Sequence, residues 1–227
     1  MKADPIDAPR ILVLASGNGT NLQALINASQ QRDFPGQIVA VGCNRPNAFA
    51  LERAAQANIE HFTVDHTLSG SRQEFDGKLM AEIRRHNPDL ILLAGFMRIL
   101  TGDFVNALRG TLMNVHPSLL PKYTGLNTHQ RALDAGDSVH GTSIHFVTEE
   151  LDGGPVIAQA QVRITREDTA ETLAEKVQAR EHLLYPIVVR WFCEGRIQLG
   201  DDHVLFDGQP LKQPMVLPDD PDTSGAG

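Results

Sequence analysis

An asparagine and a histidine stand two residues apart in Asn114-Val-His116, directly after an apolar run. Side chains two residues apart in a strand point to the same face, so we expect the amide and the imidazole to lie together. Such a pair can hold a carbonyl oxygen and transfer a proton near neutral pH. A histidine that is hydrogen-bonded for structural reasons fits the same residues, and both interpretations stay open.

A carboxylate that could join this pair lies in Leu151-Asp152-Gly-Gly-Pro155. The two glycines allow the backbone to approach a ligand closely. Asp152 could orient His116 or relay a proton, whereas the loop taken alone is more typical of an ordinary Asx turn. Because the two residues are far apart in the sequence, any pairing between them depends on the fold.

A third candidate is the loop Gly17-Asn-Gly-Thr-Asn21, which joins an apolar run to a helical pattern. Free amide hydrogens and the helix dipole at such a position favour an anion. Leu22 replaces the third glycine of the dinucleotide fingerprint, and Asn44-Arg45 stand where that fingerprint has an acidic residue. We therefore predict a site for a phosphomonoester rather than for a dinucleotide. A tight turn that binds nothing is the alternative.

The first half of the chain alternates strand and helix patterns, which predicts the scaffold that positions these residues. This order is typical of a Rossmann-like, doubly wound, mostly parallel α/β sheet, whose ligand crevice lies at the carboxyl ends of the strands. The expected strands are Ile11–Ala15, Ile38–Cys43, His61–Val64, Asp89–Ala94 and Thr111–Val115, and the expected helices are Leu22–Gln30, Ala48–Asn58, Gln73–His86 and Met97–Leu108.

The second half is predicted to be richer in β structure. A loop over His116–Asn127 and a short helix over His129–Ala135 precede two β segments, Thr142–Thr148 and Val156–Ile164, which the glycine-rich turn joins. A long amphipathic helix over Thr169–Glu194 and a hairpin over Arg196–Phe206 follow. We expect one domain over residues 1–207 and a disordered tail over residues 208–227, which is rich in Pro, Gly and Asp.

The composition argues against several classes of partner. The 227 residues carry a formal net charge of −8, which does not favour nucleic acid or an anionic membrane. The apolar runs are of strand length, and Met1–Arg10 lacks the apolar segment of a secretory signal, so we expect a cytoplasmic protein. Cys43 and Cys193 are isolated, and no His and carboxylate pair has the helical spacing of a zinc site, so we predict no metal.

Four segments taken together resemble the phosphoribosylglycinamide formyltransferase family: Ser16–Gln23, Asn114–Pro121, Gly141–Val147 and Leu151–Pro155. The resemblance runs from about Arg10 to Ile197. The Asn, His and Asp trio is common to folate-dependent formyltransferases in general, whereas the Gly-Asn-Gly-Thr-Asn loop is similar to that of the glycinamide enzymes.

The resemblance implies transfer of the formyl group of 10-formyltetrahydrofolate to the amine of 5-phosphoribosylglycinamide, a step of de novo purine (IMP) biosynthesis. It implies small-molecule partners, no metal, and a monomer or a homodimer. The resemblance also implies residue roles. The catalytic residues would be Asn114, His116 and Asp152, the phosphate would be held by Gly19, Thr20 and Asn21, and the ribose would be reached by Gln178 and Glu181. The folate site would be lined by Arg72, Met97, Arg98, Ile99, Leu100 and Asn114, with Leu100 and the loop Thr148–Asp152 at the pterin.

Two positions qualify these implied roles. Asn127 departs from the pattern, because several relatives have histidine after the Gly-Leu pair; an amide can still donate a hydrogen bond there but cannot transfer a proton. Glu181 falls inside the predicted long helix, where position alone is typical of a solvated surface charge.

Three other functions remain as alternatives. A formyltetrahydrofolate deformylase could use the same trio with water as the nucleophile, although it leaves the phosphate loop without a role and such relatives usually carry an additional amino-terminal domain. A methionyl-tRNA formyltransferase calls for a basic, RNA-binding carboxyl-terminal domain. A ligand-binding α/β domain without catalysis is the third, because a fold does not establish an activity.

Overall fold

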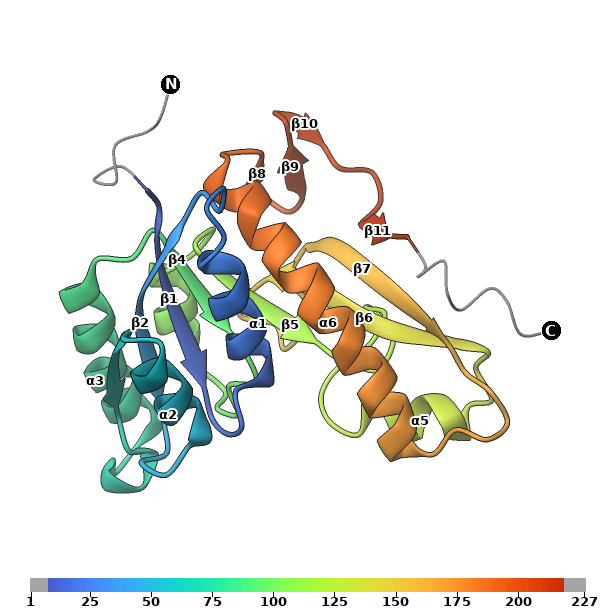
Figure 1. The fold of residues 1–227 in the computed structure, drawn as a ribbon, viewed down its shortest axis with the longest axis horizontal. Helices are drawn as coiled ribbons and strands as arrows, with labels where there is room; N and C mark the ends of the chain where they lie inside the picture. Colours follow the sequence, from blue (N-terminus) through green and yellow to red (C-terminus); the bar gives the residue numbers. More distant parts are fainter. Residues whose placement is uncertain (1–7, 219–227) are drawn as a thin grey trace.

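A twisted, mostly parallel sheet between two layers of helices forms the centre of the protein (Figure 1). The structure, a computed structural model, describes residues 8–218. The main sheet has eight strands in the order β11-β7-β6-β5-β4-β1-β2-β3. Only β6 runs antiparallel to its neighbours, β5 and β7, within this described part. The strands are β1 Arg10–Ala15, β2 Gln37–Cys43, β3 Glu60–Thr63, β4 Leu90–Leu93, β5 Leu112–His116, β6 Val139–Phe146, β7 Val156–Arg163 and β11 Met215–Leu217.

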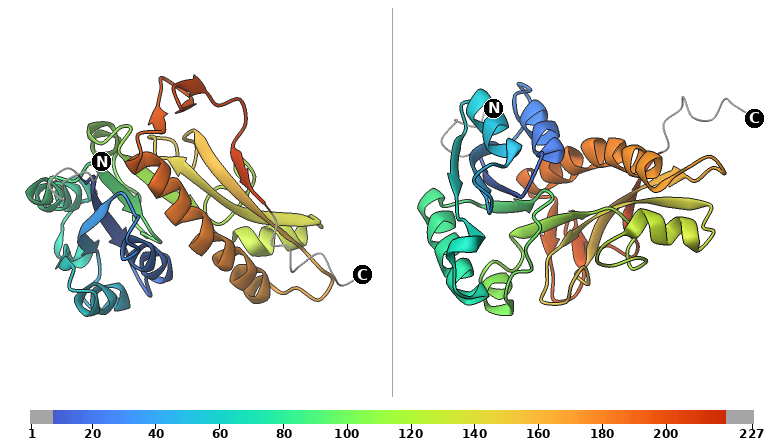
Figure 2. Two further views of the ribbon diagram at one scale, coloured as in Figure 1. Left: turned by 45° about the horizontal axis from the view of Figure 1, so that its top comes forward. Right: turned by 90° about the horizontal axis from the view of Figure 1, so that it is seen from below.

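The helices cover both faces of this sheet (Figure 2). Alternate side chains of β1 point to opposite faces: Ile11, Val13 and Ala15 pack in the cluster that contains α1, α2 and α6, whereas Leu12 and Leu14 pack in the cluster that contains α3 and α4. The helices are α1 Thr20–Ser29, α2 Phe49–Gln56, α3 Arg72–His86, α4 Gly102–Ala107, α5 Thr128–Asp134 and α6 Ala170–Cys193, and His66–Leu68 form one 3-10 turn.

The order of the strands reverses beside β1. The chain runs outward from β1 through β2 to β3 and then returns to the other side of β1 as β4. Crevices for ligands form at the carboxyl ends of strands where this reversal occurs. The two loops that leave β1 and β4 are tied together there, since the backbone N–H of Met97 donates to Oγ of Ser16 at 2.7 Å. The predicted fold class is confirmed.

The helix predicted over Met97–Leu108 is wrong in its first half. Residues 97–100 form a loop, and α4 covers only Gly102–Ala107. Thr101 adopts an extended conformation and its hydroxyl accepts from the N–H of Phe104, which is a typical N-cap. The N–H and the hydroxyl of Thr101 both bond to Oδ2 of Asp76 on α3, at 2.7 Å each. This tertiary contact fixes where the helix begins.

The predicted hairpin over Arg196–Phe206 is present as β8 Ile197–Leu199 and β9 Val204–Phe206. The expected disorder after it is not found as far as Pro218. Gln209–Pro210 form β10 of the small antiparallel sheet, and β11 adds to the edge of the main sheet in parallel with β7. The apolar sequence Met215-Val-Leu217 can fill the open edge that β7 offers. Residues 219–227 lie outside the described residues.

Candidate active site

His116 and Asp152 face each other at the carboxyl end of β5. Nδ1 of His116 lies 3.5 Å from Oδ2 of Asp152. Both side chains are almost fully enclosed, with 7% and 9% of their surfaces exposed. His116 is the last residue of β5, and Asp152 lies in the loop that joins β6 to β7. The fold therefore brings together two groups that are remote in the sequence, at a distance that allows an ion pair.

The backbone around Asp152 holds this carboxylate in place. The N–H of Gly125 donates to Oδ2 of Asp152 at 2.8 Å. Asp152 has a φ of 53°, in the left-handed region that aspartate and asparagine tolerate better than most residues. Gly154 packs so closely on β6 that a Cβ atom there would lie 1.9 Å from the carbonyl oxygen of Phe146. Glycine at 154 is therefore a condition for this loop geometry.

The second ring nitrogen of His116 is also paired. Nε2 lies 2.9 Å from the carbonyl oxygen of Tyr123. A carbonyl oxygen can only accept, so Nε2 carries a hydrogen. Nδ1, on the opposite side of the ring, faces the carboxylate of Asp152, so both ring nitrogens lie close to an acceptor.

Asn114 is paired with a histidine that carried no assigned role in the sequence. The register of β5 and β6 places Asn114 opposite His145, and Nδ2 of Asn114 lies 3.1 Å from Nε2 of His145. Nδ1 of His145 lies 2.9 Å from the carbonyl oxygen of Phe146, so Nδ1 carries the hydrogen and Nε2 accepts. Burial lowers the pKa of His145 to about 4, which keeps this ring neutral at pH 7. His145 therefore fixes the orientation of the Asn114 amide.

The loop after β1 forms a second polar centre. Gly19 has a φ of 74° and precedes α1, which has no side-chain hydrogen bond at its N-cap. Nδ2 of Asn21 donates to Oε2 of Glu181 on α6 at 2.7 Å. Oδ1 of Asn21 is buried and has no hydrogen-bond partner among the described residues. The amino end of α1 thus offers both unpaired donors and one unpaired acceptor.

Glu181 is not the surface charge that its position in the sequence indicates. It is 7% exposed, and burial raises the pKa of its carboxyl group, although the hydrogen bonds from Asn21 and Thr142 act in the opposite direction. Thr142 also donates to the carbonyl oxygen of His116 at 3.0 Å. Through Thr142 the loop after β1 is connected to the end of β5. Gln178, three residues before Glu181 on α6, is exposed.

The segment implied for the folate lies beside the loop after β1. Met97 and Ile99 are exposed at 64% and 57%, which is high for apolar side chains. The guanidinium of Arg98 lies over the ring of Phe75, 5.4 Å from its centroid, and Leu100 packs against the apolar cluster of α3 and α4. Arg72 is the first residue of α3, and its side chain is exposed.

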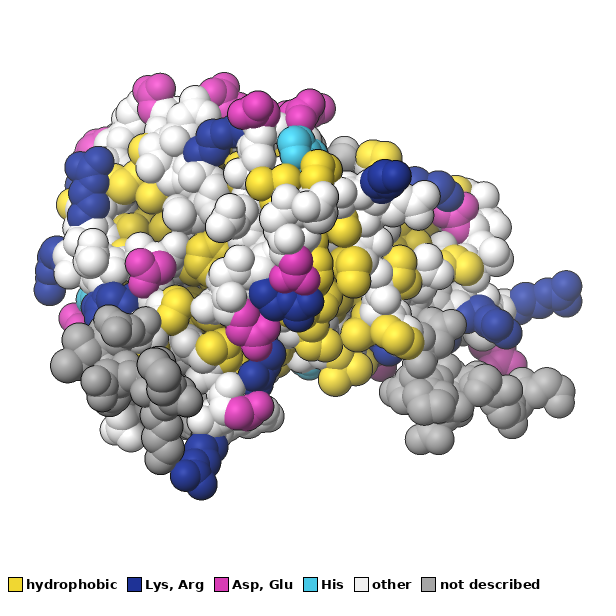
Figure 3. Space-filling view, turned by 90° about the horizontal axis from the view of Figure 1, so that it is seen from above, with side chains coloured by type: hydrophobic (Ala, Val, Ile, Leu, Met, Phe, Trp, Pro, Cys, Tyr) yellow, Lys and Arg dark blue, Asp and Glu magenta, His cyan; other side chains and the backbone are white. Residues whose placement is uncertain are grey.

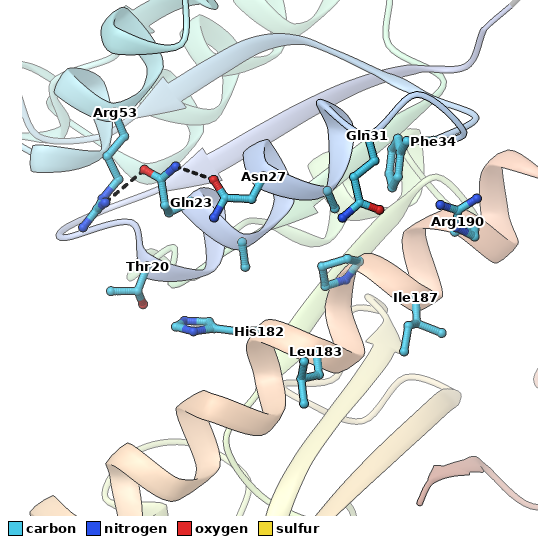
Figure 4. A pocket seen from close by; sticks show the side chains of 13 residues that line it. Thr20, Gln23, Asn27, Gln31, Phe34, Arg53, His182, Leu183, Ile187 and Arg190 are labelled. Carbon is cyan, nitrogen blue, oxygen red and sulfur yellow. Dashed lines mark hydrogen bonds between the residues drawn. The ribbon is translucent and has the colours of Figure 1, made fainter. Parts of the chain in front are cut away.

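Two hollows border the loop after β1. One, of about 620 Å³, lies between α1 and α6 and begins at Thr20 and His182 (Figure 4). The other, of about 490 Å³, is lined by residues 16–18 and 45–49. Neither includes Asn114, His116 or Asp152 among its lining residues. The pockets therefore flank the loop after β1 and do not include these three residues.

The described residues offer no cluster of side chains for a metal ion. Residues 8–218 contain no group of three or more His, Cys, Asp or Glu side chains that could hold a metal ion.

Asn127 caps α5 in a left-handed conformation, and its exposed side chain makes no capping bond. In the described part of the chain, no helix combines the length and the apolar character that crossing a membrane requires.

Known proteins match this chain over most of its length. Residues 9–189 match the formyl transferase family. The chain is 49% identical over 201 residues to the phosphoribosylglycinamide formyltransferase of Escherichia coli (strain K12), which covers 88% of this chain and 95% of that protein. The solved phosphoribosylglycinamide formyltransferase from Coxiella burnetii superposes with a TM-score of 0.88 at 49% identity, covering 92% of this chain and 99% of that one. A second structure, from Symbiobacterium toebii, superposes with a TM-score of 0.85 at 38% identity, over 88% of this chain and 94% of the other. The chain belongs to the phosphoribosylglycinamide formyltransferases of the formyl transferase family.

Proposed function

We propose that Asn114, His116 and Asp152 carry this family's reaction in the present chain, the transfer of the formyl group of 10-formyltetrahydrofolate to the amine of 5-phosphoribosylglycinamide. The observation that carries the proposal is the position of the His116 ring between the carboxylate of Asp152 and the carbonyl of Tyr123. An imidazolium held in this way supplies a positive charge at a buried site, where electrostatic stabilisation is strong.

The amine of the glycinamide attacks the formyl carbon, and negative charge develops on the formyl oxygen. One N–H of the Asn114 amide and the charge of the His116 imidazolium stabilise that oxygen. The amide donates one N–H to His145, which leaves the other for the oxygen. A new C–N bond forms to the amine, and the bond from the formyl carbon to the folate nitrogen breaks.

One proton must pass from the attacking nitrogen to the departing nitrogen. The carboxylate of Asp152 holds the imidazolium and, through a water molecule, helps this proton across. No covalent bond to the protein is required, because the substrate amine is itself a nucleophile. The N–H of Gly125 donates to Oδ2 of Asp152 and so keeps this carboxylate beside the histidine.

The loop after β1 holds the phosphorylated substrate in this proposal. Gly19, Thr20 and Asn21 present the uncapped amino end of α1 to the phosphate. The unpaired Oδ1 of Asn21 accepts from a hydroxyl of the ribose, and Glu181 and Gln178 complete the ribose contacts from α6. The buried, unpartnered oxygen supports this role because such a group is costly unless a ligand satisfies it.

The formylated co-substrate occupies the other side of the centre. Arg72 and the segment Met97–Leu100 line its site together with Asn114 and the loop Thr148–Asp152. The exposed apolar side chains of Met97 and Ile99 support this assignment, since a planar ring system covers apolar surface when it binds.

The proposed partners are small molecules, in a monomer or a homodimer. Basic and acidic side chains are interspersed on the face that Figure 3 shows, and the chain carries a net charge of −8, so neither observation favours nucleic acid. We also propose a cytoplasmic location, which the two free cysteines support.

A single assay separates this function from its alternatives. The purified protein is incubated with 10-formyltetrahydrofolate alone, with phosphoribosylglycinamide added, or with methionyl-tRNA added, and the formation of tetrahydrofolate is followed. Release that depends on the amine is expected. Release without the amine would instead indicate a hydrolase, release with methionyl-tRNA as acceptor a tRNA formyltransferase, and no release in any arm a binding domain.

A further inference from the structure

Arg53 on α2 contacts the loop after β1 although no role for it follows from the proposed function. Its Nε donates to the carbonyl oxygen of Asn18 at 2.8 Å, and its Nη2 donates to Oδ1 of the same residue at 2.8 Å. Its Nη1 donates to Oε1 of Gln23 on α1 at 3.0 Å, as Figure 4 shows. All three nitrogens of the guanidinium thus bond to the loop or to the helix that follows it.

These bonds lie on both sides of Gly19, the residue with a positive φ at the turn. Arg53 bonds to both the main chain and the side chain of Asn18. Nε2 of Gln23 in turn donates to Oδ1 of Asn27 at 2.9 Å. The guanidinium also lies over the ring of Phe49, 4.8 Å from its centroid, which restricts its orientation further. A planar fork with several fixed partners defines a geometry that a single ammonium group cannot define.

Another residue of α2, Ala50, also contacts the loop after β1. The N–H of Ala50 donates to the carbonyl oxygen of Gly17 at 3.0 Å. A Cβ atom at Gly19 would lie 2.8 Å from Cβ of Ala50, so the loop is in direct contact with the helix. Two carbonyl oxygens of the loop, at residues 17 and 18, are therefore bonded to donors on α2. An oxygen fixed in this way cannot turn toward a bound phosphate and repel it.

We propose that Arg53 is a positioning residue, which holds the loop Gly17–Asn21 in the shape that receives the phosphate of the glycinamide substrate. The inference rests on the proposed role of that loop and adds a residue outside it. Arg53 acts through Asn18 and Gln23, and the substrate needs no contact with the guanidinium.

The charge of Arg53 is a separate effect that the test must distinguish. Arg53 lines the hollow between α1 and α6 together with Thr20 and His182. Burial and, in second place, the charge of Arg53 lower the pKa of His182. If attraction of the phosphate by this charge were the whole contribution of Arg53, lysine would replace arginine without loss.

The test compares Arg53→Ala and Arg53→Lys with the unchanged protein in steady-state kinetics. We expect KM for phosphoribosylglycinamide to rise about 10-fold in both variants, with kcat and KM for 10-formyltetrahydrofolate changed by less than about 2-fold. Arg53→Ala loses all three hydrogen bonds and Arg53→Lys cannot reproduce the fork, and both changes weaken only the phosphate site. Arg32→Ala, which removes an exposed arginine just beyond α1, should leave all three constants unchanged.

Two results would overturn the inference. A normal KM for the glycinamide in Arg53→Ala would exclude a role of Arg53 in shaping the loop. A KM in Arg53→Lys equal to that of the unchanged protein would mean that Arg53 contributes only its positive charge. Asn18→Ala removes the side-chain acceptor without touching α2, and a rise of about 3-fold in the same KM is expected even where Arg53→Ala does not fold. The unchanged protein is assayed first: absence of amine-dependent transfer there contradicts the proposed function itself, whereas normal transfer with unaffected variants contradicts only the role of Arg53.

Discussion

The amide of Asn114 donates to the neutral ring of His145 at 3.1 Å, across neighbouring antiparallel strands. The ring of His145 is held in turn by the carbonyl of Phe146, and burial keeps its pKa at about 4. This arrangement decides which end of the amide is the donor, since a neutral Nε2 can only accept from it. The direction in which Asn114 offers its second N–H therefore depends on a residue one strand away.

Replacing His145 should reduce turnover although the proposed catalytic residues Asn114, His116 and Asp152 stay in place. In His145→Phe we expect kcat to fall about 10-fold, the effect of losing one positioning hydrogen bond. KM for the glycinamide should change little, because the proposed phosphate site is the loop after β1. His61→Phe, at an exposed histidine on β3, is the control and should be fully active. Normal turnover of the position 145 variant would separate His145 from Asn114.

Removing the amide itself should cost more than removing its acceptor. Asn114→Ala is expected to lower kcat by on the order of 10²-fold or more, as the loss of one oxyanion donor typically does. Steady-state rates with saturating substrates give the comparison. A variant with nearly the original turnover would show that the formyl oxygen is stabilised elsewhere.

Asp152→Asn tests the charge of the carboxylate without disturbing the loop. Asparagine tolerates the left-handed backbone of this position and keeps an oxygen for the N–H of Gly125. The thermal midpoint should therefore stay close to that of the unchanged protein. Formyl transfer should fall sharply, because the proposed role of Asp152 requires a negative charge beside His116. Full activity in a folded Asp152→Asn protein would contradict this electrostatic role.

The buried histidines predict how stability depends on pH. His145 binds its proton with a pKa of about 4 in the folded protein against 6.5 for an ordinary histidine, so the unfolded chain binds more protons between these values. Its contribution is complete above pH 6.5 and is lost as the pH falls toward 4. Between pH 7 and pH 5 the loss is on the order of 2 kcal/mol. Burial gives His140 a similar pKa of about 4, and therefore the same pH window.

Urea unfolding at pH 7 and at pH 5 measures this contribution. Glutamine does not titrate. The fall in the free energy of unfolding from pH 7 to pH 5 should therefore be smaller in His145→Gln than in the unchanged protein, by on the order of 2 kcal/mol. His140 remains in both proteins, and the comparison therefore isolates His145. Equal falls in both proteins would mean that His145 is not held neutral.

Two glycines of the loop after β1, the proposed phosphate site, differ in what a methyl group would meet. Gly19 has a φ of 74° and would place a Cβ atom 2.8 Å from that of Ala50, whereas Gly17 has nothing within 4 Å of such an atom. Gly19→Ala should therefore shift the loop and raise KM for the glycinamide about 10-fold, while Gly17→Ala stays within about 2-fold. Equal KM values in the two variants would argue against a fixed loop geometry.

The sequence by itself determined the elements and some of the local geometry. Apolar runs of five or six residues mark the buried strands, and β1 and β5 lie where these runs predict them. Alternation in a strand also placed Asn114 and His116 on one face, because this property depends on neighbouring residues alone. The four segments together were sufficient to indicate the family.

Only the tertiary structure decided how partners meet across the sheet. Asn114 and His145 are 31 residues apart, and Asn21 and Glu181 are 160 apart, so periodicity carries no information about either pair. The start of α4 depends on the bond between Thr101 and Asp76, and β11 depends on the open edge of β7. Local patterns record which face of an element is buried, whereas the strand order and the loop conformations set what that face touches, and the free energy of those contacts is gained only when the whole sheet has formed.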